Sequence, residues 1–412
     1  MINETKQNSS FSGLNNTGDE TYYYGSDGDD GTGNYYQPLE YYYFYAKKYE
    51  YVEDWEIPIR GYVTFFVALI TILTNMLLIS VFIFRSSRSP TSVVLTSLAI
   101  SDSIICMTRL PEAIYFNMAK NYQNLYVTYR WCIANHVLYI IYQIFRMTSN
   151  WCTALLGTQR LLAVALPFKY NRICSNRATI IEIAVIVTVS FLLNLYKAFG
   201  IYIAELPIYT NYYHNESLPS SCVRHVSRGL INAFGDTKTS DMIFYIFYGL
   251  LNSVLPVAVL LFTTVMLLYL LYTRQKIGPA VTQKKAQLER TTVLLCIILV
   301  IFLIAEIQDG VAYFIYADEL SGDDIRIILS KETDMKWITI SSLLSLLSYA
   351  CNFWIFFFMS QQFRSALLDM FRSGLRKANI SFVLEASEDQ INRTCCNAGK
   401  NTNTETQRSD LH

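Results

Sequence analysis

Long apolar runs set the pattern of hydrophobic and polar positions along the chain. About 20 consecutive apolar residues cross the hydrocarbon core of a bilayer as a helix. Seven runs reach or approach that length, without the apolar–polar alternation of barrel strands. The pattern therefore predicts seven transmembrane helices, over residues 60–84, 91–119, 132–166, 178–204, 242–273, 286–316 and 336–359.

Composition agrees with an all-α membrane protein, a seven-transmembrane helix bundle over residues 58–359. Hydrophobic residues make up 52% of the chain and charged residues 16%, with a mean hydropathy of +0.25. A soluble protein of this length normally carries more charge and fewer long apolar runs.

Basic residues divide the connecting segments into two sets. The segments 85–90, 167–177 and 273–290 are rich in Lys and Arg, and Glu289 is their only acid. The opposite set is acidic or mixed. The positive-inside rule then places the first set in the cytosol and the N-terminus outside, as in a multi-pass plasma-membrane protein.

Residues 1–57 are predicted to form an extracellular, disordered and glycosylated tail. They lack aliphatic residues at helical or strand spacing, so they cannot bury a core. Tyrosines beside acidic residues in this tail suit sulfation, although a solvated low-complexity tail explains them equally well. N-x-S/T glycosylation sequons, three in the tail and one in the second outer loop, occur at Asn3, Asn8, Asn15 and Asn215.

Short motifs occur in a fixed order within the predicted helices. They are LTN ending at Asn75, LAISD ending at Asp102, Arg160 in QRLLAVALPF, Pro256, and NFWIF starting at Asn352. Together they resemble the motifs of rhodopsin-like (class A) G-protein-coupled receptors. Taken alone, Arg160 could equally be an arginine that reaches the inner membrane interface.

The resemblance implies further structure and partners. It implies a short amphipathic eighth helix over 360–373 and a cytoplasmic tail over 374–412. It also implies coupling to a heterotrimeric G protein, with arrestin as a further partner. The residues expected to couple the G protein are Arg160, Lys284, Lys285 and Arg290.

Two stretches narrow the family. FLIAEIQDGV and NFWIFFFMSQQFR resemble the invertebrate FMRFamide, myosuppressin and sex-peptide receptor group, and nematode chemoreceptor-like families close to it. That group implies an amidated FMRFamide-like or myosuppressin-like neuropeptide as ligand. Gln308 stands where the group has proline, so the helix over 286–316 lacks the residue that normally kinks it.

Cys132 and Cys222 are the cysteines expected on the outer side, where a disulfide can persist. The resemblance places one at the mouth of the third helix and the other in the second outer loop. A disulfide between them would hold that loop over the pocket entrance.

Charged residues inside the predicted helices point to a binding site, since such groups are costly in lipid and face the bundle interior. The resemblance places Arg146 and Glu306 in contact, so a buried ion pair is predicted, either as a static bridge or as a switch. Asp309 and Glu112 are expected higher up, open to a cationic ligand group such as an arginine. The expected ligand-binding residues are Glu112, Tyr139, Tyr142, Gln143, Arg146, Glu306, Asp309 and Tyr313.

A second polar group resembles the sodium site of the same receptors. One carboxylate and two hydroxyls would suit a small hard cation, although a hydrogen-bonded cluster with water explains them too. No cofactor or metal beyond this allosteric sodium ion is expected. The residues of this polar core are Asn75, Asp102, Ser149, Ser348 and Asn352.

Other functions fit the chain less well. A transporter would show internal repeats, and no enzyme motif is present, so no enzymatic activity is expected. The alternative that stays open is a chemosensory receptor of the same fold for a small non-peptide ligand. Gln159 precedes Arg160 where the family has an acid, which predicts a weaker resting lock and basal signalling.

Overall fold

The computed structural model describes ten segments of the chain. They are residues 53–84, 89–121, 128–206, 210–211, 216–217, 221–227, 237–275, 282–321, 330–359 and 363–372. Most of the predicted tail, Asn215 and residues 373–412 lie outside these segments. The side chains of Lys284, Lys285, Arg290 and Cys222 also lie outside the described part, although their backbones belong to described elements.

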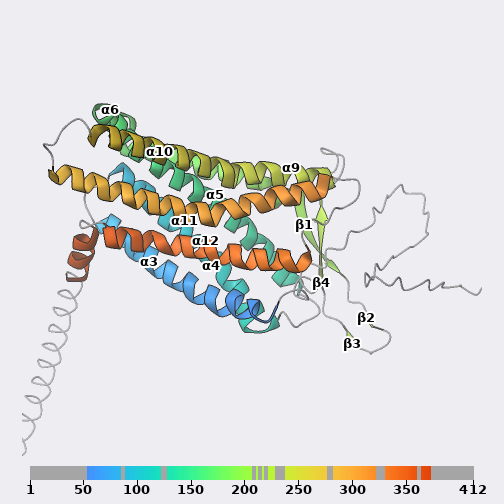
Figure 1. The fold of residues 1–412 in the computed structure, drawn as a ribbon. Coiled ribbons are helices and arrows are strands. Elements are labelled where there is room, and N and C mark those ends of the chain that lie inside the picture. The colour runs from blue at the N-terminus through green and yellow to red at the C-terminus, as the bar shows by residue number, and fades with distance from the viewer. Residues whose placement is uncertain are drawn as a thin grey trace, which may run out of the picture. The chain divides into compact units, whose positions relative to one another are not determined.

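The described helices lie side by side as a bundle (Figure 1), and each predicted helix has a counterpart in it. In chain order the bundle consists of α2 (Glu56–Pro58), η1 (Ile59–Val63), α3 (Thr64–Phe84), α4 (Pro90–Glu112), η2 (Ala113–Met118), α5 (Tyr129–Ala165), α6 (Pro167–Ile173), α7 (Asn176–Gly200), α9 (Thr237–Gly249), η4 (Leu250–Val254), α10 (Leu255–Gln275), α11 (Thr282–Ser321) and α12 (Lys331–Met359).

Capping residues and prolines explain several helix boundaries. Ser89 accepts a hydrogen bond from the Ser92 amide at the start of α4, and Ser175 does the same for Ala178 at the start of α7. The wider π-helical turns η1, η2 and η4 lie beside Pro58, Pro111 and Pro256 respectively. Proline lacks an amide hydrogen, so the helix beside it rearranges its bonds. By contrast α11, with Gln308 in place of proline, is one uninterrupted helix.

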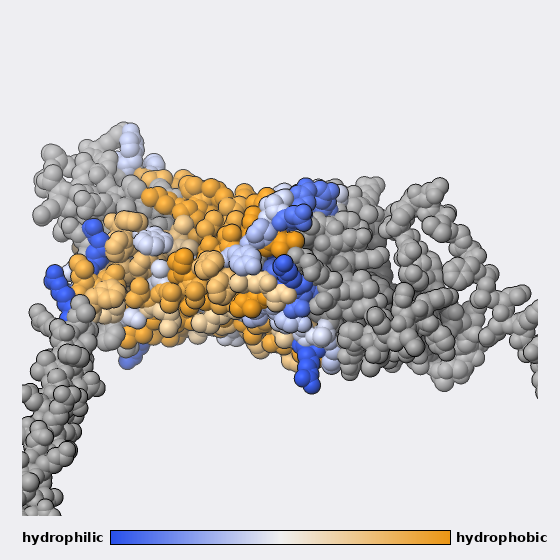
Figure 2. All heavy atoms as spheres, turned by 90° about the horizontal axis from the view of Figure 1, so that it is seen from below, coloured by the Kyte–Doolittle hydropathy of each residue, from blue (hydrophilic) through white to orange (hydrophobic). Residues whose placement is uncertain are grey.

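A wide apolar belt crosses the face of the bundle shown in Figure 2, with hydrophilic side chains towards its two ends. Phe66, Leu73, Ile181 and Phe199 are among the large apolar side chains that are more than half exposed. Five of the described helical segments are long and apolar enough to cross a membrane. The helix α5 is not one of them and carries several polar side chains that the bundle buries. The belt is the surface expected to face lipid.

The residues 363–372 are helical and fall within the range predicted for an eighth helix. Phe363 and Leu367 are buried against the end of α12, where the Phe363 and Phe353 rings lie 5.9 Å apart. An amphipathic helix buries its apolar face in this way and leaves the other face exposed.

Two short antiparallel strand pairs lie between α7 and α9. Strand β1 (Ile201–Leu206) pairs with β4 (Ser221–Val226), and β2 (Thr210–Asn211) pairs with β3 (Glu216–Ser217). The bundle is all-helical as predicted, but the helix predicted over 178–204 ends at Gly200. Ile201, Tyr202 and Ile203 favour extended structure once a partner strand is present, and their partners Val226, His225 and Arg224 lie 21 to 25 positions later in the chain.

Candidate functional site

A cavity of about 410 Å³ lies inside the bundle at the end that carries β1 and β4. We call this the pocket end, and the opposite end, where α6 lies, the α6 end. The walls of the cavity come from helices α4, α5, α7, α9, α11 and α12 together with β1. Its volume falls in the usual range for small-ligand sites, which are mostly between about 300 and 1,000 Å³.

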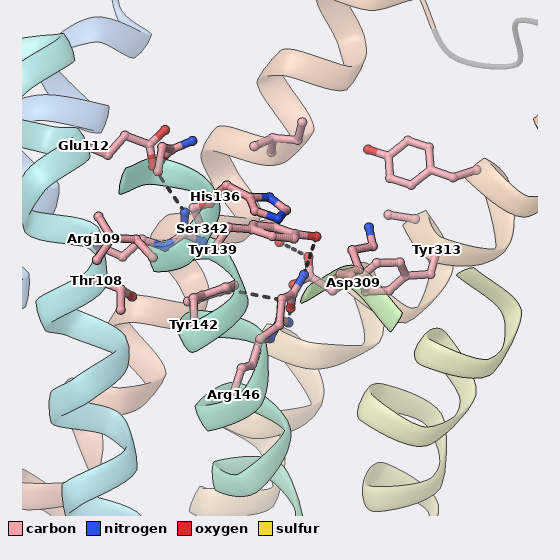
Figure 3. A pocket seen from close by; sticks show the side chains of 18 of the residues that line it. Thr108, Arg109, Glu112, His136, Tyr139, Tyr142, Arg146, Asp309, Tyr313 and Ser342 are labelled. Carbon is pink, nitrogen blue, oxygen red and sulfur yellow. Dashed lines mark hydrogen bonds and ion pairs between the residues drawn. The ribbon is translucent and has the colours of Figure 1, made fainter. Parts of the chain in front are cut away.

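Arg146 of α5 reaches towards α11 at this cavity (Figure 3). Its Nη2 lies 2.9 Å from Glu306 Oε2, which is the buried ion pair that the sequence predicts. The same Nη2 also pairs with Asp309, and Nη1 donates to the Tyr142 hydroxyl at 3.2 Å. One guanidinium therefore joins α5 to two acidic side chains of α11.

Asp309, which is expected to bind a cationic group of the ligand, has a basic and a hydroxyl partner within the bundle. Asp309 lines the cavity, but it also pairs with Arg146 and accepts a hydrogen bond from Ser341 of α12. Residues three apart share a helix face, so the long Arg146 side chain reaches both Glu306 and Asp309.

Two acidic side chains in this cluster share one basic partner, because Arg146 pairs with both Glu306 and Asp309. Glu306 accepts a further hydrogen bond from Asn150 Nδ2 at 2.9 Å and is nearly inaccessible, whereas Asp309 borders the cavity. Buried charges need partners of this kind, and Asp309 is the acid of the pair that a ligand could meet.

Glu112 also lines the cavity and has a basic neighbour of its own. Its carboxylate lies 3.7 Å from Arg109, one turn earlier on α4, and both side chains are partly exposed. Arg109 in turn lies 4.1 Å from the centre of the Tyr142 ring. Glu112 is therefore placed as predicted, but it is paired with Arg109.

The predicted aromatic wall is present. Tyr139, Tyr142, Gln143 and Tyr313 all line the cavity. Gln143 Nε2 donates to the Tyr139 hydroxyl at 2.5 Å, so these side chains hold one another in place. At Gly249 of α9 an added Cβ would come within 2.9 Å of Tyr313 Cβ. The glycine thus lets α9 pack closely against the α11 wall.

Three basic cavity residues, Arg60, Arg109 and Lys197, were not predicted as site residues. Lys197 lies near the end of α7 in an apolar segment, and its ring contacts come from α5 and α9, so only the fold could reveal them. Arg60 donates to the Met335 carbonyl at 2.8 Å and pairs with the buried Glu56 at 3.2 Å. Glu53, three residues before Glu56, pairs at 2.7 Å with the partly exposed Lys336. This contact lowers the pKa of Glu53.

The predicted polar core is assembled in part. Ser149 Oγ donates to Asp102 at 2.6 Å, and Asn352 Nδ2 donates to its other carboxylate oxygen at 2.8 Å. The Asn75 amide is fully buried and has no hydrogen bond to a described residue, and Ser348 forms none to Asp102. These two side chains start from α3 and α12, and helix rotation, which the motif does not encode, sets where they point.

The polar core fits a small monovalent cation. Asp102 is fully buried, and none of the described basic side chains forms an ion pair with it. Its carboxylate and the Ser149 hydroxyl are hard oxygen ligands. Within the described residues no group of three or more His, Cys, Asp or Glu side chains could hold a metal.

At the α6 end, Gln159 and Arg160 have different surroundings. Gln159 is buried and its Nε2 donates to Thr179 of α7 at 3.0 Å. Arg160 is partly buried and forms no ion pair with a described residue. Lys284, Lys285 and Arg290 belong to the first turns of α11.

Cys132 lines the cavity and is disulfide-bonded. Cys222 belongs to β4, opposite Glu205 of β1. Because the Cys222 side chain lies outside the described part, the pairing of these two cysteines stays a prediction.

The chain is similar to known receptor proteins. The model of the family "Serpentine type 7TM GPCR chemoreceptor Srw" matches residues 62–374. Sex peptide receptor-related protein 2 of Caenorhabditis elegans is 23% identical over 346 residues, 81% of this chain and 76% of that protein. The sex peptide receptor of Drosophila melanogaster is 25% identical over 358 residues, 84% of this chain and 80% of that protein.

Proposed function

The chain belongs to the serpentine 7TM chemoreceptor Srw family of G-protein-coupled receptors, and within this family we propose that it is a neuropeptide receptor. The ligand is an amidated FMRFamide-like or myosuppressin-like peptide carrying a basic residue. In this proposal the pocket end and the N-terminus face the outside of the plasma membrane, and the α6 end faces the cytosol. The similarity to sex peptide receptors supports a peptide ligand.

The observation that carries this proposal is the arginine that two acidic side chains share at the cavity. Glu306 and Asp309 share Arg146 as their basic partner, and Asp309 borders the open space. A ligand guanidinium offers a planar fork of donors that matches a carboxylate, and its face can stack on tyrosine rings. Tyr139 and Tyr313 line the same space.

Signalling follows from competition at Asp309. A ligand guanidinium that pairs with Asp309 weakens its hold on Arg146, and α11 is then tied to α5 through Glu306. The ligand can shift the receptor towards its active state only by its differential affinity for that state. At the α6 end Arg160 then meets the G protein together with Lys284, Lys285 and Arg290 of α11, and arrestin binds the same end.

A chemosensory receptor for a small non-peptide ligand is the second candidate. The family description favours it, and a volume of about 410 Å³ would accommodate such a molecule whole. Both candidates use the same cavity and the same route to the G protein.

An activation screen separates the two candidates. Cells expressing the full chain are tested with amidated neuropeptides and with small odorants, using G-protein signalling as the readout. The proposal expects a basic amidated peptide to activate the receptor. A response to odorants alone would favour the chemosensory receptor instead.

Two variants test the acidic cavity itself. Asp309→Asn and Glu306→Gln each remove one negative charge and are expected to reduce potency for a basic peptide by about tenfold or more. Glu332→Gln is the matched control, because Glu332 is exposed on α12 and pairs with Lys336 outside the cavity. Unchanged potency in both cavity variants, at equal surface expression, would disprove the role of the acidic cavity.

A further inference from the structure

Lys197 differs from the other basic residues that line the cavity. Arg60, Arg109 and Arg146 each form an ion pair with an acidic side chain. Lys197 is only 5% exposed, yet none of the described acidic side chains forms an ion pair with it. Burying an ammonium in this way costs desolvation free energy unless another group compensates its charge.

Three aromatic rings surround the Lys197 ammonium. Its Nζ lies 4.2 Å from the centre of the Phe244 ring, 5.3 Å from Tyr245 and 5.5 Å from Tyr139. Ring faces stabilise a cation at these distances. They do not replace an anion, and an ammonium has three hydrogen atoms to donate.

The neighbours of Lys197 are themselves held in place. Phe244 stacks between Tyr196 and Tyr248, at ring-centre distances of 5.1 and 5.2 Å. The Tyr139 hydroxyl accepts a hydrogen bond from Gln143. The ammonium is therefore positioned by α5, α7 and α9 together, which is the preorganisation that a binding group needs.

We infer that Lys197 is an anion-binding subsite of the cavity and binds a carboxylate of the ligand. The ligand is then bipolar, with a basic group at Asp309 and an acidic group at Lys197, since both residues line the same cavity. The carboxylate comes either from an acidic side chain of a peptide or from a small organic acid. The basic group at Asp309 rests on the proposed function, whereas the anion-binding subsite at Lys197 requires only that this cavity binds the ligand.

A binding experiment on the purified full chain tests the subsite without knowledge of the native ligand. Phenylacetate and phenylacetamide have the same ring and nearly the same size, but only the first is charged. Thermal unfolding is measured with each compound at equal ionic strength. We expect phenylacetate to raise the Tm more than phenylacetamide does. Equal shifts, or none from either compound, would overturn the inference.

Variants assign the preference to Lys197. In Lys197→Gln the difference between the two compounds should disappear, and in Lys197→Arg it should remain because the charge remains. Lys336→Gln is the matched control, since Lys336 lies on α12 and does not line the cavity. A preference that persists in Lys197→Gln contradicts the inference. If Lys197→Gln does not fold, Lys197→Met replaces it, and the same loss of the preference for phenylacetate is expected.

The source of the carboxylate is tested with activating ligands. Amidated peptides are synthesised in pairs that differ only by Glu or Gln, and small acids are paired with their amides. The acidic member should be about tenfold or more potent on the wild type, and the two should be equal on Lys197→Gln. If a peptide pair shows this dependence on Lys197, the carboxylate comes from an acidic side chain of the peptide. If a small-acid pair shows it, the carboxylate comes from an organic acid. If phenylacetate binding depends on Lys197 while no peptide activates, the subsite stands and the peptide proposal fails.

Discussion

Two acidic centres inside the same bundle are stabilised in different ways. Glu306 and Asp309 near the pocket end share the guanidinium of Arg146. Asp102 has no basic partner among the described residues and accepts hydrogen bonds from Ser149 and Asn352. Glu306 is 2% exposed and Asp102 is fully buried, so burial does not explain the difference.

The comparison separates a fixed counter-charge from an exchangeable one. Arg146 is covalently part of α5, so the acidic pair at the cavity always has a cation nearby, and a ligand must compete with it. The neutral donors at Asp102 leave its charge uncompensated, so a mobile cation could supply the balance. We propose that the first centre recognises the ligand and that the second responds to ions.

Removing the fixed cation should have the largest effect. Arg146→Met leaves the buried Glu306 and the partly buried Asp309 without a counter-charge and is expected to cost about 3–5 kcal/mol of folding free energy. The measurement is the Tm of the purified receptor together with surface expression. The double variant Arg146→Met with Glu306→Leu should recover part of the loss. A wild-type Tm for the single variant would show that the ion pair carries no stability.

Neutralising the second centre should have a smaller effect and change the ion response. Asp102→Asn keeps an oxygen for the Ser149 hydroxyl but removes the charge that a cation would balance. We expect sodium chloride to raise the Tm of the wild type relative to choline chloride, and Asp102→Asn to abolish that difference. Glu332→Gln, on the surface, is the control. A wild type that does not distinguish the two salts would contradict the sodium interpretation.

Adding an acid at the α6 end should have the smallest effect. Gln159→Glu places a carboxylate beside Arg160, which has no ion-pair partner among the described residues. An ion pair near the surface is worth up to about 1 kcal/mol, so basal signalling should fall roughly two- to fivefold. Gln159→Met is the control that removes the hydrogen bond to Thr179 without adding charge. Basal signalling that does not fall in Gln159→Glu would refute the weak resting lock.

Helix placement could be predicted from the sequence because lipid imposes a local rule. A spanning segment must satisfy its backbone N–H and C=O groups with its own hydrogen bonds and carry apolar side chains over about 20 residues. The motifs ending at Asn75 and Asp102 and the charges of Arg146 and Glu306 lie within such segments. Their burial therefore follows from the sequence, and so does the contact between Arg146 and Glu306 once the family resemblance is used.

Several features of the site depended on contacts between segments far apart in the chain. The pairing of Asp309 with Arg146, the lack of a hydrogen bond between Asn75 and Asp102, and the ring contacts of Lys197 all depend on helix rotation. The strands β1 and β4 depend on each other across a long connection.

The sequence by itself determined which segments span the membrane and which charges the bundle must bury, because these follow from local hydrophobicity. Only the tertiary structure decided which charge meets which. A rotation of one helix by a single residue, about 100°, exchanges the side chains that face a neighbour without altering the apolar run. That is why Arg146 has two acids and Lys197 has aromatic rings instead.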